Sequence, residues 1–200
     1  MTTLKEILST QNPFELFQSW FRTAQETKSI QEPTAMILST SSQSGQPRSR
    51  TVLLKSFSES EGFVFFTNYQ SRKGQDLASN PKAALLFYWD PLFRQIKIQG
   101  TVRKISRENS VKYWETRPRD SQLAGYMSLQ SQPVVGSLDE EFQKVKRQFE
   151  GRSIPCPENW GGFSLTPQTM EFWLGHKFRL HDRVEFQKNS TQWTAQQLFP

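Results

Sequence analysis

Apolar side chains recur at helical spacing in several parts of the chain. The clearest N-terminal case begins at Asn12, an N-cap residue, and Pro13, which suits the first position of a helix. The apolar positions that follow lie three or four residues apart, at Phe14, Phe17, Trp20, Phe21 and Ala24. By the same reasoning we expect further helices over residues 106–116, 120–129 and 137–151.

Shorter runs of alternating or continuous apolar residues predict strands. These runs span residues 34–42, 49–57, 62–68, 82–89, 94–105, 162–174, 178–188 and 192–198. Most are joined by short turns, which favours antiparallel pairing, and they do not alternate strictly with helices as in a parallel sheet. We therefore expect one mainly β domain with α-helices over residues 1–200: an antiparallel, Greek-key-like barrel, with an N-terminal segment and helix (1–30) packed outside it.

The composition narrows the class of protein. Aromatic side chains make up 13% of the 200 residues, which indicates a globular chain with a sizeable core. Cys156 is the only cysteine, so we expect no disulfide framework, no thiolate metal site and a reducing, cytoplasmic compartment. The N-terminal residues lack a signal-peptide pattern and no window approaches 18 apolar residues, so we expect no membrane partner.

The net charge of +6 would suit nucleic acid, a membrane surface or a small anion. The basic residues are scattered, without a run of five or more, which favours a phosphate-bearing small molecule over nucleic acid. The motifs of nucleotide-binding loops, zinc proteases and serine hydrolases are missing. With two His and one Cys, the chain is expected either to bind passively or to take its chemistry from a cofactor, without a metal.

The densest basic pattern lies in FWLGHKFRLHDRVEF, residues 172–186, which also holds both histidines. If residues 178–188 form a strand, Arg179, His181 and Arg183 share one face because side chains alternate along a strand. The opposite face would then be mostly apolar and turned toward a core. Two interpretations of the basic face remain open: a solvated strand surface, or the wall of an anion pocket.

A second basic signal lies in FFTNYQSRKGQDLASNP. Ser71 is a plausible N-cap, which places Arg72 and Lys73 in the first turn of a helix that ends near Asn80. Cations are unfavourable there by roughly 0.3–1 kcal/mol each, because the helix dipole is positive at its N-terminus. The pair favours a bound anion such as phosphate, although two solvated side chains would give the same pattern.

Two further groups of polar residues have uncommon spacing. Arg50 and Lys55 in RTVLLK are five residues apart, so a regular strand sends them to opposite faces. They serve one site only at a bulge, a strand end or a subunit junction, and are otherwise ordinary flanking charges. Tyr113 and Arg117 share one helix face, with Ser121 close behind, and indicate either a phosphate cradle or, for Tyr113, a packing residue.

Taken together, these segments resemble the pyridoxamine 5'-phosphate oxidase family from about residue 30 to the C-terminus. The resemblance rests on RTVLLK, FTNYQSRKGQ, RQIKIQG, KYWETRPRDSQ, QSQ, NWGGF and EFWLGHKFRLHDR, in that order. One such motif would be weak, whereas the ordered set is highly specific. The resemblance implies a homodimer of FMN-binding split barrels, with two equivalent sites at the subunit junction.

The resemblance also implies roles for particular residues. The FMN contacts would be Arg50, Val52, Leu53, Leu54, Lys55, Phe66, Thr67, Ser71, Arg72, Lys73, Gln95, Gln130, Ser131, Trp173 and Arg183. The phosphate of the substrate would meet Lys55, Tyr113, Arg117 and Ser121. Arg179 and His181 would flank its pyridine ring as the catalytic residues.

The implied reaction is oxidation of pyridoxamine or pyridoxine 5'-phosphate to pyridoxal 5'-phosphate, the last step of vitamin B6 cofactor synthesis and salvage. A hydride would pass from C4' to the flavin, and O2 would reoxidise the flavin to give H2O2, with ammonia released from the amine. The protein would orient the reactants and stabilise charge. Two alternatives remain: another FMN oxidase of this fold, such as a phenazine-biosynthesis oxidase, or a non-enzymatic barrel that binds flavin, haem or RNA.

The sequence departs from the family pattern in three places. The chain ends Gln197-Leu198-Phe199-Pro200, where members usually end Arg-Leu-x-Pro, which would change how the C-terminus packs. Phe66 stands where tyrosine is common, so a hydroxyl contact is lost there. Only residues 1–12 precede the first expected helix, whereas many members carry a longer segment that covers the substrate.

Overall fold

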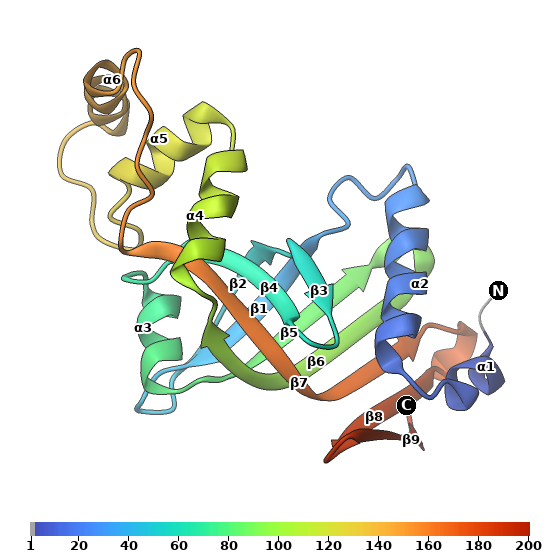
Figure 1. Ribbon diagram of the computed structural model, residues 1–200. Helices are drawn as coiled ribbons and strands as arrows, with labels where there is room; N and C mark the ends of the chain where they lie inside the picture. The colour runs from blue at the N-terminus through green and yellow to red at the C-terminus, as the bar shows by residue number, and fades with distance from the viewer. Residues whose placement is uncertain (1–2) are drawn as a thin grey trace.

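The computed structural model describes residues 3–200, which form one nine-stranded sheet with flanking helices (Figure 1). The strands are β1 (Ala35–Ser41), β2 (Pro47–Leu53), β3 (Ser56–Ser58), β4 (Gly62–Asn68), β5 (Lys82–Trp89), β6 (Arg94–Lys104), β7 (Trp160–Leu174), β8 (Asp182–Asn189) and β9 (Gln192–Leu198). The α-helices are α1 (Leu4–Ser9), α2 (Pro13–Glu26), α3 (Arg72–Ser79), α4 (Arg107–Thr116), α5 (Arg119–Met127) and α6 (Leu138–Gln148). The first two residues of the expected N-terminal segment lie outside this range.

The sheet confirms the expected antiparallel architecture. Its order is β2-β1-β5-β6-β7-β4-β3, and β8 and β9 form a hairpin that extends from β7. All of the strand pairs found within residues 3–200 are antiparallel. The sheet curls into a half-barrel, with α3 to α6 gathered at one end and α1, α2 and the β8–β9 hairpin at the other (Figure 1). No helix in this range combines the length and apolar character that a membrane span needs.

The apolar side of the half-barrel is filled by aromatic rings from α2 and the strands. The ring of Phe17 lies 4.9 Å from that of Phe63 and 5.2 Å from that of Phe87. Trp20 packs edge-on against Phe172 on β7 at 5.4 Å. Burying one large apolar side chain stabilises a fold by roughly 1.5–3 kcal/mol, so this helix is held by its apolar stripe. The apolar residues whose spacing predicted α2 are thus the residues that pack α2 into the core.

The run expected as one strand over residues 49–57 is two strands, β2 and β3, and the chain changes partners between them. The backbone N–H of Leu54 donates to the carbonyl of Thr34, at 2.9 Å, next to β1. The N–H of Lys55 donates to the carbonyl of Val64 on β4, also at 2.9 Å. The Leu54–Lys55 corner therefore joins two parts of the half-barrel, and β3 rather than β2 forms the expected hairpin with β4.

The helices that carry capping signals are confirmed. Ser71 accepts a hydrogen bond from the N–H of Gly74 at the start of α3, as its N-cap role requires. Gly74 is needed there because a side chain at this position would collide with the backbone of Tyr69. The short helix α1 was not expected, so the prediction that the first helix begins at Pro13 is wrong. Thr3 and Glu6 form a capping box at the start of α1, which is a sequence signal for a helix.

The expected strand over residues 178–188 is wrong at its N-terminal end. A single 3-10 turn, η2 (Lys177–Arg179), comes first, and β8 begins only at Asp182. Phe178 and Arg179 both have φ of 61°, in the left-handed region that an extended strand cannot contain. Arg179 and His181 therefore lie in the loop between β7 and β8, and do not share a strand face with Arg183. Leu180 is 72% exposed instead of facing the core.

Candidate functional site

A cleft of about 770 Å³ opens beside β2 and β4, beneath α4 and α5. Its volume lies in the range of roughly 300–1,000 Å³ that is typical of small-molecule sites. The predicted FMN contacts that line it are Arg50, Val52, Leu53, Lys55, Phe66, Thr67, Lys73 and Gln130. All four predicted contacts to the substrate phosphate also line it: Lys55, Tyr113, Arg117 and Ser121. Arg50 and Lys55 reach the same cleft because the Leu54–Lys55 corner ends the alternation of β2.

One end of the cleft is formed by the first turn of α3. The ammonium group of Lys73 is buried and donates to Thr67 Oγ1 at 3.2 Å and to Gln130 Oε1 at 2.9 Å. Burial, together with the charge of Arg50, lowers the pKa of Lys73 to about 8. A cation held in this way at the N-terminus of a helix, where the helix dipole is positive, is stabilised when an anion binds next to it.

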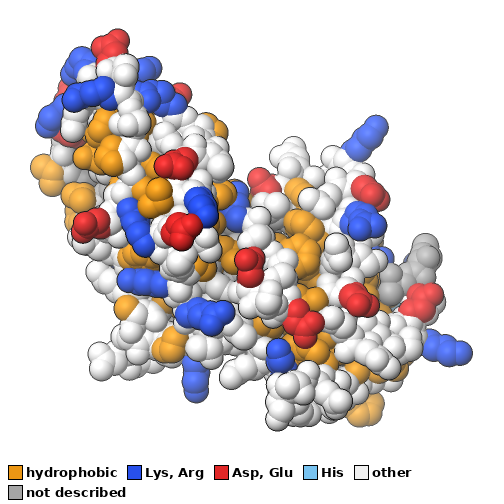
Figure 2. Space-filling view, in the orientation of Figure 1, with side chains coloured by type: hydrophobic (Ala, Val, Ile, Leu, Met, Phe, Trp, Pro, Cys, Tyr) orange, Lys and Arg blue, Asp and Glu red, His pale blue; other side chains and the backbone are white. Residues whose placement is uncertain are grey.

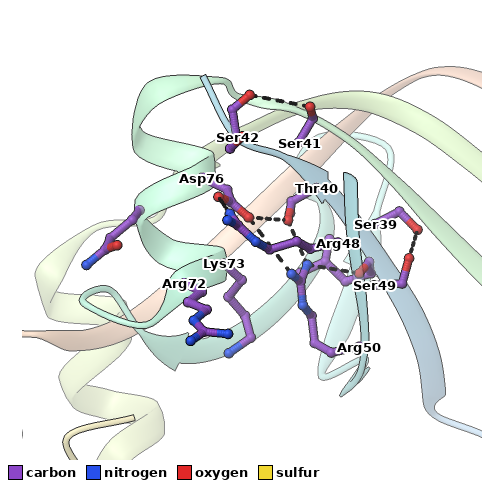
Figure 3. Close-up of polar contacts among 12 residues, drawn as sticks. Ser39, Thr40, Ser41, Ser42, Arg48, Ser49, Arg50, Arg72, Lys73 and Asp76 are labelled. Carbon is purple, nitrogen blue, oxygen red and sulfur yellow. Dashed lines mark hydrogen bonds and ion pairs between the residues drawn. The ribbon is translucent and has the colours of Figure 1, made fainter. Parts of the chain in front are cut away.

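Four predicted FMN contacts at this end or nearby are not among the residues that line the cleft. Arg72 is exposed and extends from α3 beside Lys73 (Figure 3), and its backbone N–H donates to Ser131 Oγ at 3.3 Å. The hydroxyl of Ser71 is buried and accepts from Lys73 Nζ at 3.3 Å. Leu54 is buried in the core, so its side chain does not face the cleft. Ser71 thus supports the lining side chain of Lys73, and Arg72 and Ser131 border the cleft.

Arg117 lies at the other end of the cleft and packs against two indole rings that contact each other. Its guanidinium carbon lies 5.1 Å from the ring centre of Trp114 and 4.8 Å from that of Trp160. Burial lowers the pKa of Arg117. Its Nη1 atom is buried and finds no hydrogen-bond partner within residues 3–200. A buried, unsatisfied guanidinium nitrogen beside a cleft fits an anionic ligand such as phosphate.

Aromatic rings form the wall between these two cationic ends. The rings of Phe66 and Tyr113 stack with their centres 3.9 Å apart, and Trp160 stacks on Phe66 at 5.3 Å. A side chain on Gly162 would collide with the Phe66 ring and with Ile105, so glycine leaves room for the stack. Phe66 therefore supplies a ring surface to this wall, although it lacks a hydroxyl group.

The remaining predicted contacts form a separate group, which does not line the cleft. Gln95, Trp173 and Arg183 are direct cross-strand partners on β6, β7 and β8. This row lies at the start of β6 and the end of β7, near α1 and the β8–β9 hairpin, whereas α3 to α5 lie at the opposite end (Figure 1). One chain therefore brings together part of the predicted site and holds the rest elsewhere.

The loop between β7 and β8 carries the two predicted catalytic residues. The Nδ1 atom of His181 accepts a hydrogen bond from the backbone N–H of His176 at 3.1 Å, so the neutral ring carries its proton on Nε2. The ring also packs against Trp173, with centres 4.7 Å apart. The side chain of His176 contacts Asp182 at 2.7 Å across the loop, and Arg179 is exposed. His181 thus presents a donor to whatever approaches it.

Two buried acids that support these groups were missed in the sequence. Glu171 is 3% exposed, and its Oε1 accepts from Arg183 Nε at 2.8 Å while Lys97 pairs with the other oxygen. Burial raises its pKa, but the hydrogen bonds from Arg183 and Lys97 outweigh burial and leave the pKa below its usual value. The sequence signal that could have revealed Glu171 is its place as a charged residue between the apolar Met170 and Phe172. The second acid, Asp76 on α3, is also buried.

The surface around the site is mixed in charge. Figure 2 shows Lys and Arg side chains over the end that carries α4 to α6 and over the sheet below it, interspersed with acidic ones. No single basic stripe crosses this face. Within residues 3–200, no three His, Cys, Asp or Glu side chains are grouped so as to hold a metal ion.

The half-barrel recurs in solved structures and defines a class of split-barrel proteins. The chain superposes on PhzG from Burkholderia lata 383, solved with tetrahydrophenazine-1-carboxylic acid, with a TM-score of 0.90 at 29% identity, over 96% of this chain and 94% of that one. A pyridoxamine 5'-phosphate oxidase-related, FMN binding protein from Nostoc punctiforme gives a TM-score of 0.77 at 17% identity, over 96% and 100% of the two chains, which shows a shared fold.

Sequence comparison identifies the family. Residues 23–149 match the pyridoxamine 5'-phosphate oxidase family, and residues 160–200 match the pyridoxine 5'-phosphate oxidase C-terminal dimerisation region. The chain is 47% identical to pyridoxine/pyridoxamine 5'-phosphate oxidase 2 of Hydrogenovibrio crunogenus over 191 residues, 94% of this chain and 89% of the relative. It is 46% identical to pyridoxine/pyridoxamine 5'-phosphate oxidase of Crocosphaera subtropica over 194 residues, 94% and 90% of the two. The chain therefore belongs to the pyridoxamine 5'-phosphate oxidase family of oxidoreductases, as its motifs predicted.

Proposed function

We propose that this chain binds FMN and oxidises pyridoxamine and pyridoxine 5'-phosphate to pyridoxal 5'-phosphate, with O2 as the electron acceptor and H2O2 as a product. The observation that carries this proposal is that one cleft has two separate cationic ends. Lys73 and the start of α3 form one end, and Arg117 forms the other. A cleft of this kind suits two phosphate groups at once, one on a cofactor and one on a substrate.

The end at α3 fits the phosphate of FMN. A phosphate here would lie at the positive N-terminal end of the α3 dipole and would accept from Lys73, whose buried charge it would neutralise. Arg50 lines the same end, and Arg72 extends beside Lys73 (Figure 3). Bound at this place, FMN would supply the ring that takes a hydride from the substrate and passes electrons to O2.

The end at Arg117 fits the phosphate of the substrate. The guanidinium group of Arg117 would donate to it, with Lys55, Tyr113 and Ser121 nearby on the cleft wall. This phosphate takes no part in the bond that changes, so its contacts anchor the substrate and orient its ring. The stacked rings of Phe66 and Tyr113 add an apolar wall that excludes water.

The row of Gln95, Trp173 and Arg183, together with the β7–β8 loop, completes the cleft of a second copy in this proposal. On the open face of the sheet, Ile37 is 37% exposed and Tyr88 is 52% exposed. Tyr88 is the cross-strand partner of Gln95, so this partly apolar face is continuous with the row. The match of residues 160–200 to a dimerisation region supports a homodimer in which this region contacts the second copy.

Within such a dimer, Arg179 and His181 would meet the pyridine ring of the substrate. His181 would donate from Nε2, because its Nδ1 is engaged by the backbone of its own loop. Arg179 would add a positive charge close to the flavin, which gains negative charge when it accepts the hydride. These two residues would orient the ring and stabilise charge, and no nucleophile is needed.

A phenazine-type oxidase is the second candidate, because PhzG shares the fold with a TM-score of 0.90. Identity favours the first candidate, at 47% to the Hydrogenovibrio relative against 29% to PhzG. Purified protein should be yellow, sediment as a dimer, and release H2O2 with pyridoxine 5'-phosphate but far less with pyridoxine. Equal turnover of the two would refute the substrate class. A colourless protein that gains no flavin spectrum with FMN would refute the cofactor.

A further inference from the structure

A buried carboxylate lies behind the proposed flavin-phosphate end of the cleft. Asp76 is on α3, one turn after Arg72, and its side chain is 3% exposed. Arg48 Nη1 donates to its Oδ1 at 2.5 Å, and the hydroxyl of Thr40 donates to its Oδ2 at 2.8 Å. Figure 3 shows this cluster between α3 and the strands β1 and β2.

Arg50 is tied into the same cluster. Its Nη1 donates to the Thr40 hydroxyl at 2.8 Å and to the carbonyl of Leu38 at 3.1 Å, and its Nη2 lies 3.9 Å from Asp76 Oδ2. The Thr40 hydroxyl has one proton, which it gives to Asp76, so its lone pairs face Arg50. Burial lowers the pKa of Arg50, and the Asp76 carboxylate opposes this. The guanidinium group is thus fixed by hydrogen bonds to Thr40 and Leu38, with the Asp76 carboxylate behind Thr40, while its side chain lines the cleft.

We propose that Asp76, neutralised by Arg48, is a positioning residue that holds Arg50 in place for the phosphate of the flavin. The inference rests on the proposed function, because the α3 end is assigned to FMN there. Asp76 acts through Arg50 and Thr40 and does not touch the ligand. Arg48 completes the arrangement, since its charge cancels that of the carboxylate and limits repulsion of the phosphate.

Whether Asp76→Asn weakens or tightens FMN binding distinguishes a positioning role of Asp76 from a purely electrostatic effect of its charge. A carboxylate near a phosphate site repels the ligand, so by charge alone Asp76→Asn should tighten FMN binding. If Asp76 positions Arg50, the same change should weaken FMN binding, because the guanidinium loses its fixed orientation. We expect the second effect to dominate, because Arg48 already pairs with the carboxylate at 2.5 Å.

The experiment titrates flavin-free protein with FMN and with riboflavin, which lacks the phosphate, and follows flavin fluorescence. For Asp76→Asn we expect the Kd of FMN to rise by about 5- to 20-fold, less than the loss of a whole charge-assisted hydrogen bond, because Arg50 itself remains. The Kd of riboflavin should stay unchanged. Asp139→Asn makes the same change of charge at an exposed position in the first turn of α6, and should alter neither value.

A second variant tests the bridge itself. Thr40→Val removes the hydroxyl and keeps the shape, and it should weaken FMN by about 3- to 10-fold while sparing riboflavin. If Asp76→Asn fails to fold, the Thr40→Val variant tests the inference by itself. Unchanged or tighter FMN binding, or an equal loss of both flavins, would overturn the inference and leave the proposed function standing. A wild-type protein that binds neither flavin refutes the proposed function and the inference with it.

Discussion

The cleft beneath α4 and α5 and the β7–β8 region hold their polar residues in different ways. In the cleft, Lys73 is buried among acceptors and Arg117 packs against two indole rings, so both cations are fixed before a ligand arrives. In the β7–β8 region, Arg179 is exposed on a loop with left-handed backbone, and His181 is only half-buried. The first region is preorganised by its own chain, whereas the second is presented outward.

This difference indicates a division of tasks in the proposed dimer. The cleft would bind the two phosphates, which need fixed cations in a partly dry environment. The loop and the row behind it would approach the reacting ring from a second copy. Arg183 is held for this by the buried Glu171, and its Nη1 donates to the carbonyl of Phe199 at 2.9 Å. The following experiments test whether the two regions act as parts of one site.

The largest effect is expected at the phosphate anchor. Arg117→Ala should lower kcat/KM for pyridoxine 5'-phosphate by about 100-fold, mostly through KM, because a buried charge-assisted contact is lost. The variant should also discriminate less between the phosphorylated and the plain vitamin. Steady-state kinetics with both substrates measure this, and Arg103→Ala, at an exposed position on β6, is the control. An unchanged ratio of the two kcat/KM values would remove Arg117 from the phosphate site.

At the cofactor end, Arg72→Ala should weaken FMN binding by roughly 1.5–3 kcal/mol, the scale of a charge-assisted hydrogen bond to phosphate. Arg72 is exposed, so the fold should keep its stability. Fluorescence titration of the flavin-free protein gives the Kd, and thermal unfolding without flavin checks the fold. Equal affinity in the variant and the wild type would show that Arg72 is merely solvated.

Hybrid dimers test the division directly. Arg117→Ala and Arg179→Ala chains, co-expressed with different tags and purified as hybrids, should regain roughly half of wild-type activity, because one of the two sites then takes both intact residues. Each parent dimer should be at least about tenfold less active than the hybrid. If both residues served the same chain's cleft, every site in the hybrid would be defective and activity would stay at the parental level.

The smallest effect is a pH dependence at Lys73. Its pKa of about 8 lies below that of an exposed lysine, so between these values the unfolded chain binds more protons than the folded one. As pH rises from 8 toward the unfolded value, Lys73 should therefore make the flavin-free protein more stable, while FMN affinity falls because the neutral amine no longer attracts phosphate. Lys73→Met should remove both trends, as measured by denaturant unfolding and flavin titration at each pH. If the variant shows the same pH dependence of stability and of FMN affinity as the wild type, other groups cause both trends.

Much of the fold could be predicted because its signals are local. Asn12 and Pro13 start α2, and Ser71 caps α3, where the sequence places them. The strand alternation in β6 also holds, with Ile96 and Ile98 fully buried. The β7–β8 loop could not be predicted in this way. Alternation continues through the sequence, but only the φ angles of the intervening residues show that the chain turns.

The candidate site was predictable to a smaller extent. Spacing alone left Arg50 and Lys55 on opposite faces, and the corner between them depends on hydrogen bonds to β1 and β4 that no local pattern encodes. Asp76 and Glu171 were missed for a related reason. A buried acid requires partners, and those of Asp76 come from β1 and β2, Thr40 among them, far from α3 in the sequence. The family resemblance, rather than periodicity, pointed to the lining residues.

The pairing of β4 with β7 also bears on the order in which the protein folds. Phe63 pairs with Leu165, so two segments roughly 100 residues apart must meet before the half-barrel exists. The hydrogen bond from Thr67 to Gln130 joins residues that are 63 apart in the sequence, at the Lys73 end of the cleft. Such distant contacts form late, because a long loop must close first. A chain still emerging from the ribosome thus carries the RTVLLK and SRK segments early but has no cleft until β7 is in place, and a ligand that binds the cleft selects finished molecules and holds them folded.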